Sequence, residues 1–309
     1  MARFADALLA RAGRAAPRPA AAALRQPAPI PVSDAVALLR VAVEAARMAG
    51  GLLAERARHA SARGGVSSKS TPTDLVSEAD LLSERAIREL LGRRRPADGF
   101  VGEEGGRAWE GESGLSWIVD PLDGTVNFLF GIPQWCVSVA ARDRHGVLAG
   151  AIYDPNRDEL FTATRDGPAE LEGPDGRARL AGRERAVVAD GAPAAQDGGL
   201  ASAMVATGLY YDAAVRAAQA RVLERLVGRV RDIRRFGSAA LDLAWTAAGR
   251  YDAYFERGVK QWDIAAGALM CRRAGLDVVE LEPDAELPAG ILAAPPALAG
   301  PLLALVSGS

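Results

Sequence analysis

The first third of the chain carries two runs in which apolar residues recur with the spacing of a helix. Residues 33–58 form the first run, and Ser33 is its expected N-cap. The second run starts at about residues 74–77 and ends at residues 92–94. The Ser/Gly/Thr-rich stretch between the two runs is typical of a loop. The folded part of the chain is therefore expected to begin with two amphipathic helices.

From about residue 99 onward, short apolar runs bounded by glycine and acidic residues predict strands. Up to residue 165 these strands follow one another closely, with one short helix expected in "GTVNFLFG". After residue 200 the predicted strands alternate with helices such as "AAVRAAQARVLERLVGRV". This order is typical of an α/β (α+β) protein in which mixed sheets are covered by helices.

The composition is that of a folded globular protein and limits the classes of partner. The chain has 309 residues, 49% of them hydrophobic and 25% charged, which is enough for one large or two ordinary domains. Its net charge of -2 creates no overall field that attracts nucleic acid or a membrane. No apolar stretch approaches the roughly 20 residues of a membrane span. We therefore expect neither nucleic acid nor a membrane as a stable partner, and a cytoplasmic location.

The chain divides into three parts by composition. Residues 1–32 are rich in Ala, Arg and Pro and predict a flexible extension, with an organellar transit peptide as the alternative. Residues 33–185 and 186–309 predict two folded halves, separated by a polar, Ala/Gly-rich stretch. Cys136 and Cys271 lie in apolar contexts, so we expect buried thiols in a reducing compartment.

Acidic residues gather where predicted strands end or helices begin. In "WIVDPLDGTVNF", Asp120 and Asp123 come directly after an apolar run and are expected in a tight turn. Acids in similar positions are Glu103, Glu104, Asp263, Asp74 and Asp80. Any one of these is explained by a solvated turn or a helix cap. Converging carboxylates, however, repel one another unless a cation neutralises them, and Mg²⁺ prefers oxygen ligands.

Gly124 and Thr125 follow the acid pair and add a second kind of chemistry. Gly124 lets a ligand approach the backbone, and Thr125 begins a helix whose free N–H groups favour a bound anion. Carboxylates that hold metal beside amides that hold an anion predict a site for a phosphate ester. A glycosidase that uses two carboxylates without a metal is the alternative.

Three motifs in this order, "GEEG", "DPLDGTVNF" and "WDIAAG", resemble those of the inositol monophosphatase family of Mg²⁺-dependent, lithium-sensitive phosphatases. The resemblance covers the chain from about Asp34 to its end. It implies a layered α-β-α-β-α sandwich of the sugar-phosphatase type, two or three Mg²⁺ ions, a small phosphorylated polyol as substrate and a homodimer.

The resemblance also implies roles for individual residues. One Mg²⁺ would be held by Glu103, Asp120 and the carbonyl of Leu122, a second by Asp120, Asp123 and Asp263, and a third, weaker one by Glu103 and waters. Asp80 and Thr125 would orient the attacking water, and the N–H groups of Gly124 and Thr125 would bind the phosphate. Lys69 would stabilise the loop that carries these acids. The resemblance thus implies four catalytic residues, Asp80, Thr125, Glu103 and Lys69.

The alcohol half of the substrate would be bound by a second set of residues. The resemblance assigns Gly237, Ser238 and Ala239 to the polyol, and Glu256 and Asp123 to its hydroxyl groups. Inositol-1-phosphate is the expected substrate, and histidinol phosphate is the alternative. A regulatory protein that binds RNA-processing or transcription machinery is an alternative of another class. The segment "RDGPAELEGPDGR" departs from the family pattern and is expected to form an altered loop.

Overall fold

The computed structural model describes residues 32–58, 67–68, 75–104, 111–183 and 199–307. Lys69, Asp74 and nearly all of the predicted extension lie outside these residues, so predictions on them stay predictions. The division between residues 185 and 186 also falls outside them. Residues 31–309 belong to one compact unit that contains both large sheets.

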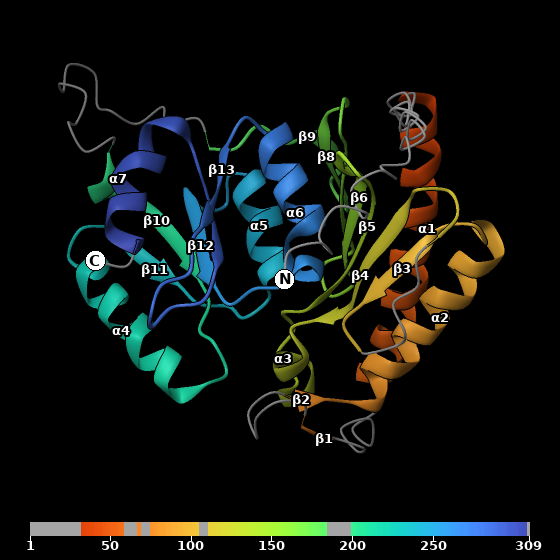
Figure 1. Cartoon of the computed structure of the whole chain (residues 1–309), viewed down its shortest axis with the longest axis horizontal. Helices are drawn as coiled ribbons and strands as arrows, with labels where there is room; N and C mark the ends of the chain where they lie inside the picture. Colours follow the sequence, from red (N-terminus) through yellow and green to blue (C-terminus); the bar gives the residue numbers. More distant parts are fainter. Residues whose placement is uncertain (1–31, 59–66, 69–74, 105–110, 184–198, 308–309) are drawn as a thin grey trace, which may run out of the picture. The chain divides into compact units, whose positions relative to one another are not determined.

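The first large sheet has seven strands in the order β3-β4-β5-β6-β7-β8-β9. Only β3 and β4 are parallel, and every later neighbour is antiparallel. The strands are β3 (Gly99–Gly102), β4 (Ser116–Asp123), β5 (Cys136–Asp143), β6 (Gly146–Asp154), β7 (Glu159–Thr164), β8 (Ala169–Gly173) and β9 (Gly176–Arg179). Two helices, α1 (Val32–Ala57) and α2 (Glu78–Arg94), pack on one face of this sheet (Figure 1).

The second large sheet has five strands in the order β11-β10-β12-β14-β13 and mixes parallel and antiparallel pairs. Its strands are β10 (Met204–Thr207), β11 (Asp232–Arg234), β12 (Ala253–Arg257), β13 (Asp277–Leu281) and β14 (Gly290–Ala294). The smaller elements are β1 (Ser67–Ser68), β2 (Leu75–Val76), the helix α3 (Thr125–Phe130) and a 3₁₀ turn at Leu200–Ser202.

Helices lie between the two sheets and outside them, as Figure 1 shows. The middle layer is formed by α5 (Ala239–Ala247) and α6 (Gln261–Arg273), which contact strands of both sheets. The outer layer is formed by α4 (Ala213–Val227) and α7 (Pro296–Val306). This arrangement confirms the predicted order of layers, helix-sheet-helix-sheet-helix.

Small residues explain how a helical layer fits between two sheets. A side chain added at Gly150 of β6 would lie 2.9 Å from Ala266 of α6, and one at Gly267 would lie 2.5 Å from Leu243 of α5. The backbones therefore approach closely at these points. Because α5 meets protein on both sides, eight of its nine residues are buried. The strong apolar character of this helix thus follows from its position rather than from one amphipathic face.

Three local predictions were wrong. Helix α1 begins at Val32, so Ser33 lies inside it, whereas Ser77 is the N-cap of α2. Strand β4 does not end at Asp120 but continues to Asp123, with a register shift against β5 between these two residues. The expected altered loop near residue 170 is the hairpin β8–β9, whose mostly exposed or half-buried residues lack the alternation that marks a strand.

The prediction of two buried thiols is confirmed. Cys136 and Cys271 are free thiols with 0% exposure. Among the described residues, no helix is both long enough and apolar enough to cross a membrane.

Candidate active site

A cavity of about 190 Å³ opens where β4 ends and the N-termini of α3, α5 and α6 meet. Residues from five separate parts of the chain line it. They are Glu103, Asp120, Leu122, Asp123, Gly124, Thr125, Leu209, Tyr210, Tyr211, Arg235, Gly237, Ala239, Glu256, Gly258, Val259, Lys260, Trp262 and Asp263. The cavity therefore contains most of the residues that the sequence predicted for one site.

Five of the lining residues are acids, and four of them, Glu103, Asp120, Asp123 and Asp263, lie close enough to repel one another. Burial raises the pKa of Asp120 well above its usual value, and the charges of Glu103, Asp123 and Asp263 raise it further. Burial likewise raises the pKa of Asp263, with Asp123 and Glu103 adding to the effect. Acids as far apart in sequence as positions 103 and 263 thus share one electrostatic environment.

The backbone and a hydroxyl orient three of these carboxylates. One oxygen of Asp120 accepts from Leu122 N at 3.0 Å, and one oxygen of Asp263 accepts from Lys260 N at 2.6 Å. Asp123 Oδ2 accepts from Ser238 Oγ at 2.6 Å and from Ala240 N at 2.8 Å. Burial raises the pKa of Asp123 to about 6, although these bonds to Ser238 and Ala240 oppose the rise.

The donor set fits a hard divalent cation. It offers carboxylate and carbonyl oxygens, which Mg²⁺ prefers, and the mutual repulsion of the acids would be relieved by positive charge between them. In the part of the chain that the structure describes, no three such side chains already form a complete ligand set. Asp120 shares a hydrogen bond with Glu103, and Asp123 accepts hydrogen bonds at both of its oxygens. Small carboxylate rotations would thus accompany binding.

A second buried pair lies beside the acids. Thr125 Oγ1 is 2.8 Å from Asp80 Oδ1 and 3.1 Å from the carbonyl oxygen of Leu122. Asp80 is fully buried, and its other oxygen accepts from the N–H and the hydroxyl of Ser77 at 2.8 and 2.5 Å. A threonine hydroxyl has one proton, and the carboxylate is the stronger of the two acceptors. Thr125 therefore donates to Asp80, and its lone pairs stay available to a water.

The start of α3 requires glycine. Gly124 has a φ of 98°, and a side chain there would lie 2.8 Å from the carbonyl oxygen of Gln134. Any other residue would be strained in this conformation and would also clash. The turn leaves the N–H groups at the beginning of α3 beside the acids, as the sequence predicted.

Glu256, near the end of β12, also lines the cavity. Its Oε2 accepts from Tyr254 Oη at 2.8 Å, and burial raises its pKa to about 7. Gly237, with a φ of 83°, and Ala239 line the cavity beside it. Ser238 lies behind the wall, is 1% exposed and donates to Asp123. Its predicted contact with the substrate stays a prediction.

Sequence reasoning missed several lining residues. Tyr210 N donates to Gln219 Oε1 at 2.8 Å, which ties this segment to α4, and the Tyr210 ring packs where Gly258 has no side chain. Tyr211 and Arg235 also line the cavity. Arg235 could have been predicted as a lining residue, because it stands two residues before Gly237, which was assigned to the site. Nothing in the sequence around Tyr210 marks it as part of a site.

The model of the inositol monophosphatase family matches residues 34–307. The chain belongs to this family. "Inositol-1-monophosphatase SuhB" of Mycobacterium tuberculosis is 41% identical over 247 residues, which are 78% of this chain and 81% of that protein. The "Nus factor SuhB" of Xylella fastidiosa is 42% identical over 203 residues, 65% of this chain and 67% of that protein.

Solved structures show the same likeness. The crystal structure of the extragenic suppressor protein SuhB from Bartonella henselae matches with a TM-score of 0.74 and 37% identity, over 88% of this chain and 100% of that one. The family member described here is accordingly a phosphoric monoester hydrolase that depends on metal and acts on a small phosphorylated substrate. The cavity at the end of β4 is the candidate for its active site.

Proposed function

We propose that this chain hydrolyses inositol-1-phosphate or a similar small polyol monophosphate by direct attack of water, with two or three Mg²⁺ ions at Glu103, Asp120, Leu122, Asp123 and Asp263. The observation that carries the proposal is the hydrogen bond from Thr125 to buried Asp80 at the edge of a cavity walled by acids. When bound, Mg²⁺ supplies polarisation of the phosphoryl oxygens, a more acidic water and neutralisation of the leaving alkoxide.

The chain's own residues would place the reactants. The hydroxyl of Thr125 accepts a hydrogen bond from the attacking water and passes its own proton toward Asp80 Oδ1. The N–H groups at the start of α3, at Gly124 and Thr125, donate to the phosphate oxygens. Glu256, which also lines the cavity, accepts hydrogen bonds from substrate hydroxyls. Different residues of one cavity thereby bind the alcohol and the phosphate.

The dimensions of the cavity support a small substrate. Its volume of about 190 Å³ is below the roughly 300–1,000 Å³ that is usual for sites of larger ligands. A polyol monophosphate suits this space better than a nucleotide does. Binding of a phosphate monoester should also depend on cations. Without them, the negative phosphate would meet the negative charges of four acids.

The test compares four substrates by kcat/KM: inositol-1-phosphate, histidinol phosphate, adenosine 3′,5′-bisphosphate and fructose 1,6-bisphosphate. We expect inositol-1-phosphate to be hydrolysed fastest, with activity lost in EDTA, restored by Mg²⁺ and absent in Asp120→Asn. If histidinol phosphate is hydrolysed fastest, the proposed substrate is wrong but the proposed reaction stands. Full activity in EDTA would refute the metal sites.

A regulatory role is the second candidate, because the relative from Xylella fastidiosa is named a Nus factor. The intact set of acids favours catalysis, since clustered buried charge is costly to a fold that does not use it. Failure to hydrolyse any monoester at high Mg²⁺ would favour the regulatory role.

A further inference from the structure

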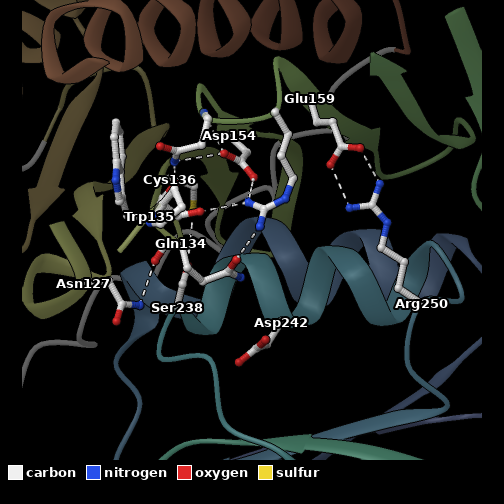
Figure 2. Close-up of polar contacts among 12 residues, drawn as sticks. Asn127, Gln134, Trp135, Cys136, Asp154, Glu159, Ser238, Asp242 and Arg250 are labelled. Carbon is white, nitrogen blue, oxygen red and sulfur yellow. Dashed lines mark hydrogen bonds and ion pairs between the residues drawn. The ribbon is translucent and has the colours of Figure 1, made fainter. Parts of the chain in front are cut away.

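Asn127 lies in α3, two residues after Thr125, and is 6% exposed. Its Nδ2 donates to the carbonyl oxygen of Gln134 at 2.8 Å (Figure 2). It also donates to that of Phe236 at 2.7 Å and lies 3.3 Å from that of Gly237. Three carbonyl oxygens around one nitrogen fix the orientation of this amide, because only the NH₂ group donates. Asn127 thus joins the helix at the phosphate side to a turn 109 residues further along.

The turn reached by Asn127 is the one that orients Asp123. Directly after Gly237, Ser238 Oγ and Ala240 N donate to Asp123 Oδ2, and Ala239 N lies 3.3 Å from Oδ1. Asp123 itself is followed by Gly124, the N-cap of α3. The contacts therefore close a ring, from Asp123 through α3 to Asn127, across to the turn, and back to Asp123.

We infer that Asn127 is a positioning residue that holds the substrate-side turn in register with the start of α3, and so fixes the direction of the Asp123 carboxylate. Asn127 does not itself line the cavity, and it reaches the wall residue Gly237 and the acid Asp123 only through the turn. Gly237, with its φ of 83°, gives the turn no stiffness of its own. The Asn127 amide supplies the missing constraint. The inference rests on the proposed function for its kinetic readout and for the binding of Mg²⁺ at Asp123, but not for the exchange readout.

Asn127→Asp tests this arrangement, since it keeps the shape of the side chain while it removes both donors and turns negative charge toward three carbonyl oxygens. Asn127→Leu removes the donors without adding charge. Asp98→Asn is the matched control: Asp98 is 3% exposed, accepts from Ser113 and Trp117, and does not line the cavity. The Asp98→Asn variant shows how much the loss of a buried polar contact outside the cavity lowers the stability of the fold.

The readouts are amide hydrogen exchange in residues 236–240 without metal, Mg²⁺ affinity by calorimetry, and kinetics. Both Asn127 variants should speed exchange in this turn about 10-fold or more and weaken Mg²⁺ binding by roughly 10–100-fold, the range for residues that orient metal ligands. KM should rise and kcat should fall. In Asp98→Asn the exchange of the turn, the Mg²⁺ affinity, KM and kcat should stay near the wild-type values. This should hold even if its Tm falls as far as that of the Asn127 variants.

Equal effects in the Asn127 variants and in Asp98→Asn would overturn the inference and leave Asn127 a residue of general stability. If neither Asn127 variant folds, Gly237→Ala serves instead, because its methyl group would press against Arg235 and lie 3.4 Å from Asn127 Nδ2. Should the wild type hydrolyse no monoester, the proposed function fails, whereas exchange and calorimetry still decide the role of Asn127.

Discussion

Thr125 Oγ1 and Asp80 Oδ1 lie 2.8 Å apart, although 45 residues separate them in the chain. Asp80 is held by the Ser77 cap at the start of α2, and Thr125 begins α3, so each group is fixed by the first turn of a helix. The pair is 0% and 8% exposed, and its geometry is thus set before any substrate arrives. Preorganised groups of this kind lower the cost of reaching the transition state.

Thr125→Val should lower kcat by about 10²–10⁴-fold, the contribution of a positioned acid–base group, with little change in KM. Thr125→Ser retains the hydroxyl and should retain most of the activity. Asp80→Asn should resemble Thr125→Val, because the amide accepts the Thr125 proton poorly. Steady-state kinetics at saturating Mg²⁺ measures all three. A Thr125→Val enzyme within a few-fold of wild type would remove this residue from the mechanism.

Asp120→Asn should have opposite effects on stability and on metal binding. In the metal-free protein Asp120 either repels its neighbours or must take up a proton, because burial and the nearby acids raise its pKa. The neutral amide avoids both costs and should raise the Tm of the metal-free protein above that of the wild type.

Thermal melts with and without Mg²⁺ check this prediction. Addition of Mg²⁺ should raise the Tm of the wild type and leave that of Asp120→Asn nearly unchanged. A variant that is less stable than the wild type in EDTA would show that Asp120 stabilises the fold without metal, contrary to the argument from its buried charge.

The stability of the metal-free protein should fall as the pH rises from about 4.5 to 7. Burial raises the pKa of Asp123 to about 6 and that of Glu256 to about 7, above the values of about 4 that unfolded chains have. Between these values the folded state binds more protons than the unfolded state does, so ionisation at higher pH favours unfolding. Saturating Mg²⁺ should reverse the trend, because it stabilises the ionised acids.

Thermal melts from pH 4.5 to 7.5 in EDTA test the sign. Exposed acids such as Asp232 and Asp284 do not disturb this test, because hydrogen bonds lower their pKa values. They lose their stabilising effect only at a pH below this range. Glu256→Gln should flatten the upper part of the slope. A Tm that rises with pH in EDTA would contradict the assigned burial of these carboxylates.

Several features of the fold could be predicted from local patterns because they are encoded locally. The apolar run of β4 and the helical period of α2 each lie within one segment, and so does the Ser77 cap with Asp80. The hairpin β8–β9 could not be predicted in this way. It lies at the edge of its sheet with polar residues on exposed faces, so burial imposes no alternation on it.

The acids of the site could be found from sequence because each stands next to a recognisable motif. Their convergence depends on the tertiary fold and became visible only in the shared cavity. Tyr210 and Asn127 were missed for a related reason. Each acts through partners far along the chain, Tyr210 against Gly258 and Asn127 against Phe236, and no spacing along the sequence records such contacts.

Gly208→Ala should weaken substrate binding through Glu256, although residue 208 does not line the cavity. A methyl group at position 208 would lie about 2 Å from the Glu256 carboxyl, which must therefore move away from Tyr254 Oη. If Glu256 binds the polyol, KM for inositol-1-phosphate should rise about 10-fold, the equivalent of about 1.4 kcal/mol from a charged hydrogen bond. Glu256→Gln should give a similar change.

The comparison substrate is p-nitrophenyl phosphate, whose leaving group has no hydroxyls for Glu256 to bind. Its KM and kcat should stay within a few-fold of wild type in both variants. Neither variant changes the four acids proposed to bind metal or the Thr125–Asp80 pair. A matched control is Gly228→Ala, since an added side chain there meets nothing within 4 Å. Equal losses for both substrates would mean that Gly208→Ala disturbs the metal side instead, and Glu256 would lose its assignment to the polyol.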